Sequence, residues 1–213
     1  MLSNLSKAFL GCLLIGASAT GANALTIGGF DFDDNAGVDQ LNASSPANTF
    51  RIGISTATSV DEVESVLTDN SQNTTATLFN SSAFVELAFV DNVLVNAPGI
   101  DLVIFETGFS IGGTDFVNVT INGTTFAGQG VDTGEFAGGF QLNQISIELS
   151  NFGILEGGEV SSVRLGTALG DLPTIAFVGA LNSTEIPLPA PVFLLLAGLA
   201  GLGLAARKHA RSD

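Results

Sequence analysis

The sequence predicts an all-β protein: a single β-sandwich domain of the jelly-roll type, with roughly nine strands and at most one short helix. Three observations predict this class. Short runs alternate between apolar and polar side chains, as strands with one buried face do. Pairs of Gly, Asn and Pro residues separate these runs. The 213 residues include only one Cys, so the core has to be stable without an internal disulfide.

The clearest strands are predicted where the alternation is most regular. Residues 84–90, 116–121 and 145–149 each place apolar side chains on one face and polar side chains on the other. Residues 102–105 are continuously apolar, which is typical of a central strand buried on both faces. Further strands are expected at residues 25–32, 50–55, 75–79, 159–165 and 175–181.

Turn and helix signals complete this pattern. Asn122-Gly123 lies between two strand-like runs and predicts a two-residue hairpin turn of type I′. Residues 59–67 are the one helical candidate, with Ser59 or Asp61 as the N-cap. Its apolar face is expected to carry Val60, Val63 and Leu67. We see no second domain and no repeat in the remaining sequence.

The N-terminal residues 1–24 are predicted to be a secretory signal peptide with a short apolar helix. Lys7 supplies a positive charge, residues 8–16 are apolar, and Ala22 and Ala24 form the small-x-small pattern at which such signals are cleaved. An uncleaved anchor is the alternative. It is disfavoured because the apolar run has about half of the roughly 20 residues that a membrane span needs.

The C-terminal sequence predicts a transmembrane helix. Residues 188–206 form an apolar run of 19 residues, about one bilayer long. Arg207, Lys208 and Arg211 follow it and are expected to stay in the cytoplasm by the positive-inside rule. A signal peptide before the domain and a stop sequence after it would place the intervening residues outside the inner membrane.

This C-terminal arrangement resembles a known sorting signal. Ile186, Pro187, Leu188, Pro189 and Ala190, followed by the apolar run and the basic cluster, resemble the PEP-CTERM signal in its VPLPA variant, with Ile in place of the usual Val. The resemblance implies recognition by an exosortase-type membrane protease and cleavage near the Pro motif. It further implies transit through the inner membrane to the surface or extracellular matrix of a Gram-negative bacterium that makes exopolysaccharide. A permanent single-pass anchor is the alternative.

Three segments of the expected mature domain extend the resemblance. Residues 27–35 and 84–92 are similar to segments of many PEP-CTERM surface proteins. Residues 96–106 are similar to a bacterial extracellular module with a pattern near PGxDhxVFE, which looks related to galactose-binding-like jelly rolls. The expected organisation is therefore a signal peptide at residues 1–24, a β-sandwich at 25–185 and a sorting signal at 186–213.

The composition of the mature domain excludes most partners and most catalysis. The whole chain has a net charge of −15, but residues 25–185 hold only two basic residues against 20 acidic ones, a net charge of −18. This charge argues against nucleic acid as a partner. The domain also lacks His, Cys, Lys, Tyr and Trp. Catalytic triads, lysine Schiff bases and the usual zinc sites are therefore excluded.

Clustered carboxylates leave calcium binding open. Carboxylate and amide oxygens at strand ends can hold Ca²⁺ when two loops meet. The same residues would otherwise be solvated or form turns. No cofactor is certain from the sequence. The candidate calcium ligands are Asp31, Asp33, Asp34, Asp91, Asn96, Asp101 and Glu106.

Three functions follow from these observations. The favoured one is a non-enzymatic exported protein of the cell surface or matrix, associated with exopolysaccharide. The second is a calcium-dependent carbohydrate-binding module. The third is a glycosidase that uses Glu86 and Glu106 as its two carboxyl groups. The absence of Trp and Tyr weighs against both sugar-binding alternatives, since sugars are commonly held by stacking on such rings.

Overall fold

The protein is mostly β, as predicted. The computed structural model describes residues 25–108, 115–168 and 170–186. These contain 17 short strands, one α-helix and two 3₁₀ helices. The number of strands exceeds the expected nine because several predicted runs are divided by turns and because some strands carry weak alternation.

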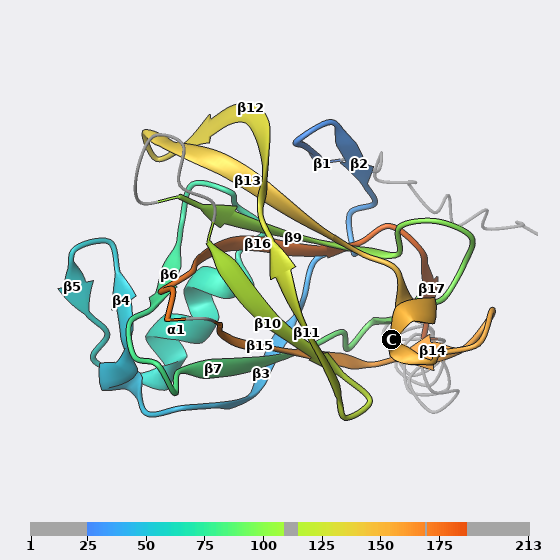
Figure 1. Cartoon of the computed structure of the whole chain (residues 1–213), viewed down its shortest axis with the longest axis horizontal. Coiled ribbons are helices and arrows are strands. Elements are labelled where there is room, and N and C mark those ends of the chain that lie inside the picture. The colour runs from blue at the N-terminus through green and yellow to red at the C-terminus, as the bar shows by residue number, and fades with distance from the viewer. Residues whose placement is uncertain (1–24, 109–114, 169, 187–213) are drawn as a thin grey trace, which may run out of the picture.

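The strands form two large sheets in which every pairing is antiparallel (Figure 1). The first sheet has the order β11 (Thr124–Gln129), β10 (Phe116–Ile121), β15 (Ser162–Thr167), β7 (Phe84–Ala88) and β3 (Gln40–Ser44). The second has the order β12 (Val131–Ala137), β13 (Phe140–Ile147), β9 (Leu102–Thr107), β16 (Thr174–Ala180), β6 (Ala76–Leu78), β4 (Phe50–Ile52) and β5 (Ser55–Thr56).

One apolar core lies between the two sheets. Alternate residues of the first sheet, such as Leu87 and Val119, belong to the same buried cluster as Ile104 and Ile145 of the second. This is the arrangement that strand alternation produces when each sheet buries one face. The predicted inward-facing residues of β7 and β10 are confirmed.

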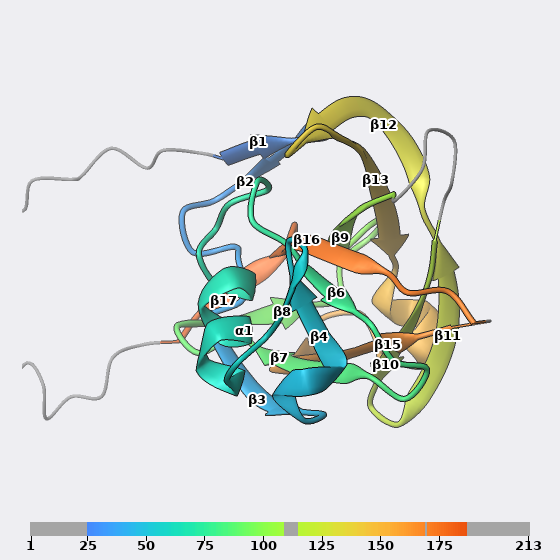
Figure 2. The ribbon, with the colours of Figure 1, turned by 90° about the vertical axis from the view of Figure 1, so that its left-hand side faces the viewer.

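A second, smaller core lies on the opposite face of the seven-stranded sheet. The hairpin of β1 (Leu25–Ile27) and β2 (Phe30–Phe32) covers this face (Figures 1 and 2). Phe32 packs edge-on against Phe177 with 5.2 Å between the ring centroids and against Phe105 with 6.1 Å. Because both faces of β9 and β16 are covered, both strands are wholly buried, which explains why residues 102–105 are continuously apolar.

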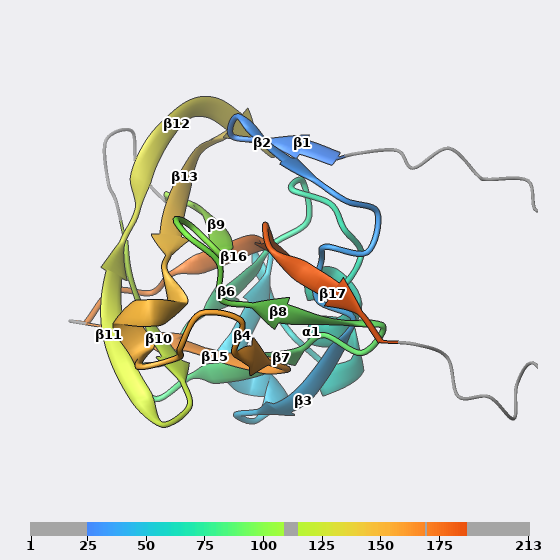
Figure 3. The same ribbon diagram turned by 90° about the vertical axis from the view of Figure 1, so that its right-hand side faces the viewer.

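Small elements cover the ends of the main core. Helix α1 (Val60–Leu67) packs against β3, β4, β6 and β16 at one end (Figure 2). At the other end lie a three-stranded sheet and the 3₁₀ helix η2 (Figure 3). The bounds of these elements and of the other 3₁₀ helix are β14 (Glu159–Val160), β8 (Asn92–Val95), β17 (Ser183–Glu185), η1 (Ala47–Thr49) and η2 (Leu149–Phe152).

The helix prediction is confirmed with one change. Ser59 is the N-cap, and its hydroxyl accepts a hydrogen bond from the Glu62 N–H at 3.2 Å. Val63 and Leu67 are buried as expected, whereas Val60 is 38% exposed. The one change is that Val60, the first residue of the helix, is exposed rather than buried.

Local turns explain where the predicted strands were too long. Gly28 and Gly29 have positive φ angles of 58° and 80° and divide residues 25–32 into the β1–β2 hairpin. Residues 50–55 likewise contain the β4–β5 turn, and 159–165 are interrupted at Ser161. The Asn122-Gly123 turn is confirmed: both residues have positive φ, and Ile121 pairs with Thr124.

Candidate functional site

The seven predicted calcium ligands do not gather around one point. Asp101 precedes β9 and Glu106 lies near the other end of that strand. Five residues of extended chain span about 16 Å, whereas calcium–oxygen distances are about 2.3–2.6 Å. Asp101 and Glu106 therefore cannot bind the same ion.

Asp101 has a structural role in the fold. It is fully buried, and its carboxylate accepts hydrogen bonds from Ala97 N at 2.8 Å, Leu149 N at 2.9 Å and Asn182 Nδ2 at 3.0 Å. Asn96 is also buried and donates from Nδ2 to the Ile154 carbonyl at 2.7 Å. These bonds join the loops at the η2 end of the core, and buried polar groups need such partners.

The remaining acidic candidates lie on other loops. Asp31 accepts a hydrogen bond from the Thr26 hydroxyl across the β1–β2 hairpin at 2.7 Å. Asp33 and Asp34 are exposed and line a small pocket beside Asn70. Asp91 lies beside Asp39 instead. Burial, and then the charge of Asp39, raise the pKa of the Asp91 carboxyl.

No group of three or more acidic, His or Cys side chains close enough to hold a metal occurs among the described residues. Calcium binding by a smaller subset of the candidates stays a prediction.

Glu106 is the most unusual side chain of the second sheet. It shares the inner face of β9 with Leu102 and Ile104 and is fully buried. Its Oε1 accepts a hydrogen bond from Asn143 Nδ2 on β13 at 2.7 Å, while Oε2 has no hydrogen-bond partner among the described residues. The pKa of Glu106 is raised to about 7, mainly by burial and in part by the charge of Asp115, while the Asn143 hydrogen bond acts to lower it. The alternation of 102, 104 and 106 would have predicted this inward position.

A pocket of about 380 Å³ lies close to this buried carboxyl. Asp115 and Asp171 line it, and their charges act on Glu106. Asp171 accepts a hydrogen bond from Phe116 N at 3.0 Å, while burial, and then the charge of Asp171, raise the pKa of Asp115. Arg51 lies over the Phe79 ring at 3.3 Å in the same pocket. Sequence reasoning missed Asp115 and Asp171 because they lie in loops that only the fold brings together.

The two carboxyl groups considered for glycoside hydrolysis do not face each other. Glu86 lies on β7 between the buried Val85 and Leu87, so its side chain is on the outer face of the five-stranded sheet. Glu106 points into the core from the other sheet. A glycosidase needs its two carboxyl groups on either side of one sugar bond. This arrangement does not provide that geometry.

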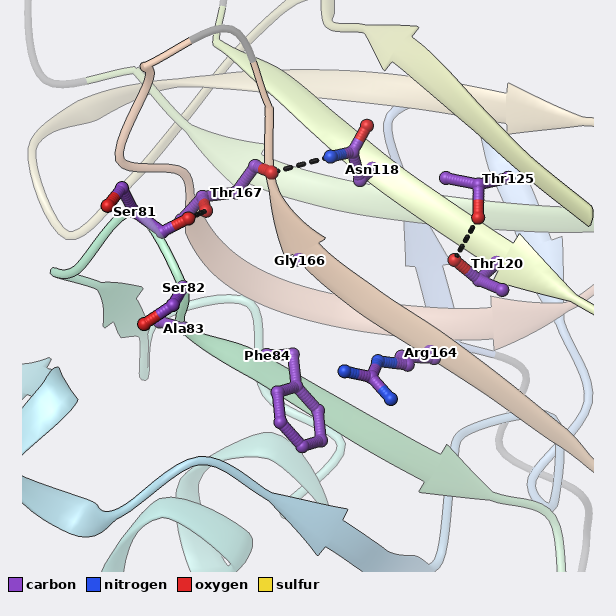
Figure 4. A pocket seen from close by; sticks show the side chains of 10 residues that line it. All are labelled: Ser81, Ser82, Ala83, Phe84, Asn118, Thr120, Thr125, Arg164, Gly166 and Thr167. Atoms are coloured by element: carbon purple, nitrogen blue, oxygen red, sulfur yellow. Dashed lines mark hydrogen bonds between the residues drawn. The ribbon is translucent and has the colours of Figure 1, made fainter. Parts of the chain in front are cut away.

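A second pocket, of about 390 Å³, lies on the outer face of the five-stranded sheet (Figure 4). Its lining is mainly polar. Arg164 lies over the Phe84 ring at 3.6 Å, and Asn118 donates from Nδ2 to the Thr167 carbonyl at 2.6 Å. The hydroxyl oxygens of Thr120 and Thr125 are 2.7 Å apart and form a hydrogen bond between β10 and β11. The sequence offered no motif for this pocket, since its residues come from four strands and one turn.

The predicted signal-peptide and sorting residues lie outside the described part of the chain, except for Ile186. Its N–H donates to the Asp91 carbonyl at 2.8 Å, directly after β17. No helix within the described residues is long and apolar enough to cross a membrane. The residues that remain predictions are Ala22, Ala24, Pro187, Leu188, Pro189, Ala190, Arg207, Lys208 and Arg211.

Fold and sites together define a strongly acidic, mostly antiparallel β protein with a buried carboxyl and a polar pocket on one sheet. Comparison with known proteins adds no relative: no family, no curated protein and no solved structure matches this chain.

Proposed function

We propose that the chain is a non-enzymatic exported protein of the bacterial cell surface or extracellular matrix, sorted and cleaved by an exosortase-type protease. The observation that carries the proposal is the sequence from Ile186 onward: a Pro motif, an apolar run and a basic cluster. The folded sheet supports it, because β17 ends at Glu185 and the Pro motif begins with the next residue, Ile186. The cleavage segment would therefore start next to an ordered edge of the domain.

The domain itself suits an extracellular location. Its net charge of −18 leaves many carboxylates exposed, and divalent cations outside the cell would reduce their mutual repulsion. Its two arginines, Arg51 and Arg164, lie over phenylalanine rings.

For the finer fold we propose a β-sandwich of the jelly-roll type, related to galactose-binding-like modules. The support is the pair of antiparallel sheets around one core.

The sorting proposal is tested in cells that produce the protein. A double variant, Pro187→Ala with Pro189→Ala, should prevent cleavage at the Pro motif and leave a chain that still ends at residue 213 in the inner membrane. Mass spectrometry of both termini reads the result directly. Pro98→Ala is the matched control, because Pro98 is exposed in the domain and far from the motif in sequence. A double variant that is processed and released like the wild type would contradict the proposal.

A further inference from the structure

The pocket lined by Asp115 and Asp171 also has an apolar wall. Its members are Ile54 in the β4–β5 turn, Phe79 just after β6 and Leu172 shortly before β16, and all three are exposed. Ile54 is 98% exposed, although turns usually carry Gly, Asn, Asp, Pro or Ser. Three exposed apolar side chains around one cavity of about 380 Å³ provide a surface for an apolar group of a small ligand.

Two carboxyl groups give the same pocket a negatively charged part. The Asp171 carboxylate accepts a hydrogen bond from Phe116 N at 3.0 Å, which fixes its position. Asp115 is half-buried, and burial, followed by the charge of Asp171, raises its pKa. An ammonium group beside these carboxylates would compensate both charges and could donate up to three hydrogen bonds.

Arg51 gives the pocket a separate positively charged part. Its guanidinium lies over the Phe79 ring at 3.3 Å. Stacking uses the flat face of the guanidinium, so the N–H groups at its edge can bind a carboxylate through two parallel hydrogen bonds. The pKa of Asp115 responds to the charge of Asp171 and not to that of Arg51. The positive and negative parts of the pocket therefore lie apart.

From this arrangement we infer that the pocket binds a small zwitterion with an apolar side chain, of the class of free apolar amino acids and dipeptides. The ammonium group of the ligand lies at Asp115 and Asp171, and its carboxylate lies at Arg51. The apolar side chain of the ligand packs against Ile54 and Leu172. Each part of the ligand thus meets a part of the pocket with matching chemistry, and the cavity volume is in the range of small-ligand sites.

Other ligands match only part of this pocket. An alkyl amine would leave the charge of Arg51 without a partner, and an alkyl carboxylate would add a negative charge beside Asp115 and Asp171. A metal ion would lack ligands, because the described residues include no group of three or more acidic, His or Cys side chains that could hold one.

Two substitutions remove the charged groups of the pocket. Asp171→Asn removes a negative charge and keeps an oxygen that can accept the Phe116 hydrogen bond. Its control is Asp61→Asn, which makes the same change at an exposed position of α1. Arg51→Gln removes the guanidinium. Its matched control is Arg164→Gln, which removes the same charge and a similar ring contact on the other sheet.

A third substitution tests the apolar wall without affecting the core. Ile54→Ser should leave the fold intact, because the side chain of Ile54 is almost wholly exposed. Leu155→Ser is the matched control, since Leu155 is also strongly exposed but lines a different pocket. Ile54→Ser therefore decides the question if a charge substitution lowers the stability of the domain.

The test is isothermal titration calorimetry of the whole chain in mild detergent at pH 7. The probes are L-leucine and leucyl-leucine, and the tighter of the two identifies the free amino acid or the dipeptide as the preferred ligand. Isopentylamine, isocaproate and glycine each lack one of the three ligand groups and should bind at least about tenfold more weakly. Asp171→Asn and Arg51→Gln should weaken binding of the preferred probe at least about tenfold, and Ile54→Ser at least about threefold. The three control variants should bind it like the wild type.

Several results would overturn the inference. These are no binding of either zwitterion, binding of isopentylamine or isocaproate as tight as that of L-leucine and leucyl-leucine, and unchanged binding by Ile54→Ser. Equal weakening by Arg51→Gln and Arg164→Gln would also contradict it, because a general effect of charge would then explain the loss. The binding measurement does not depend on cleavage of the chain, so its result is independent of the sorting proposal.

Discussion

Glu106 makes the stability of the protein depend on pH. Its pKa is about 7 in the folded protein, compared with an ordinary value of 4.5. A raised pKa means that the folded state holds the proton more tightly than the unfolded state. The stabilisation is therefore complete below about pH 4.5 and is lost as the pH rises through 7.

We expect Glu106→Gln to be more stable than the wild type at pH 8 and to show a weaker pH dependence. The shift of the pKa corresponds to a loss of about 3 kcal/mol for the wild type between pH 4.5 and pH 8. Gln keeps an oxygen that can accept the Asn143 hydrogen bond. Urea unfolding at several pH values measures the difference, and parallel curves for the two proteins would contradict it.

Residue-scale predictions from sequence had mixed success for a physical reason. Asp101 and Glu106 are among the candidate calcium ligands because sequence shows clustering of charge without showing burial. Asp101 is satisfied by three hydrogen bonds, and Glu106 is directed inward by the alternation of β9. Asp115 and Asp171 approach Glu106 only through tertiary folding, so no local pattern could have revealed them.

At the scale of elements, the β1–β2 hairpin depends on one phenylalanine. Phe32 is 1% exposed and contacts three other Phe rings at the second core. Phe32→Ala should lower the free energy of unfolding by about 3–5 kcal/mol, as deletion of a buried aromatic ring does. It should also speed amide hydrogen exchange in β1 and β2.

Phe136→Ala is the control for this prediction. Phe136 is 67% exposed on β12, so its removal should change stability by less than about 0.5 kcal/mol. Chemical unfolding measures the free energy of unfolding of the two variants. Equal decreases for Phe32→Ala and Phe136→Ala would contradict the proposed role of Phe32 in the second core.

Element prediction succeeded where pattern and turn chemistry agreed. The alternation of β7 and β10, the Asn122-Gly123 turn and the Ser59 cap are all present in the fold. It failed for β12, which is largely exposed and therefore has no buried stripe to detect. It also merged β1 with β2, because a run of apolar residues does not show that two glycines reverse the chain.

For the whole molecule, charge repulsion should limit stability. A domain with 20 acidic and two basic residues repels itself, and salt screens that repulsion. We expect NaCl between 0.05 and 0.5 M to raise the unfolding temperature by about 2–8 °C, corresponding to ~1–2 kcal/mol. Calorimetry measures this shift, and an unfolding temperature that falls or stays constant with salt would contradict the prediction.

The same measurement tests calcium binding. Calcium chloride at matched ionic strength should give the same shift as NaCl if screening alone operates. An additional rise with millimolar Ca²⁺ would indicate a bound ion.

The positions of the two arginines have a consequence for digestion by proteases. Trypsin-like proteases cut after Arg or Lys, and residues 25–186 offer only Arg51 and Arg164. Both bonds lie inside strands, Arg51 within β4 and Arg164 within the central strand β15. Cleavage would require these strands to leave their sheets first. The folded domain should therefore resist proteases of this specificity until β4 or β15 opens.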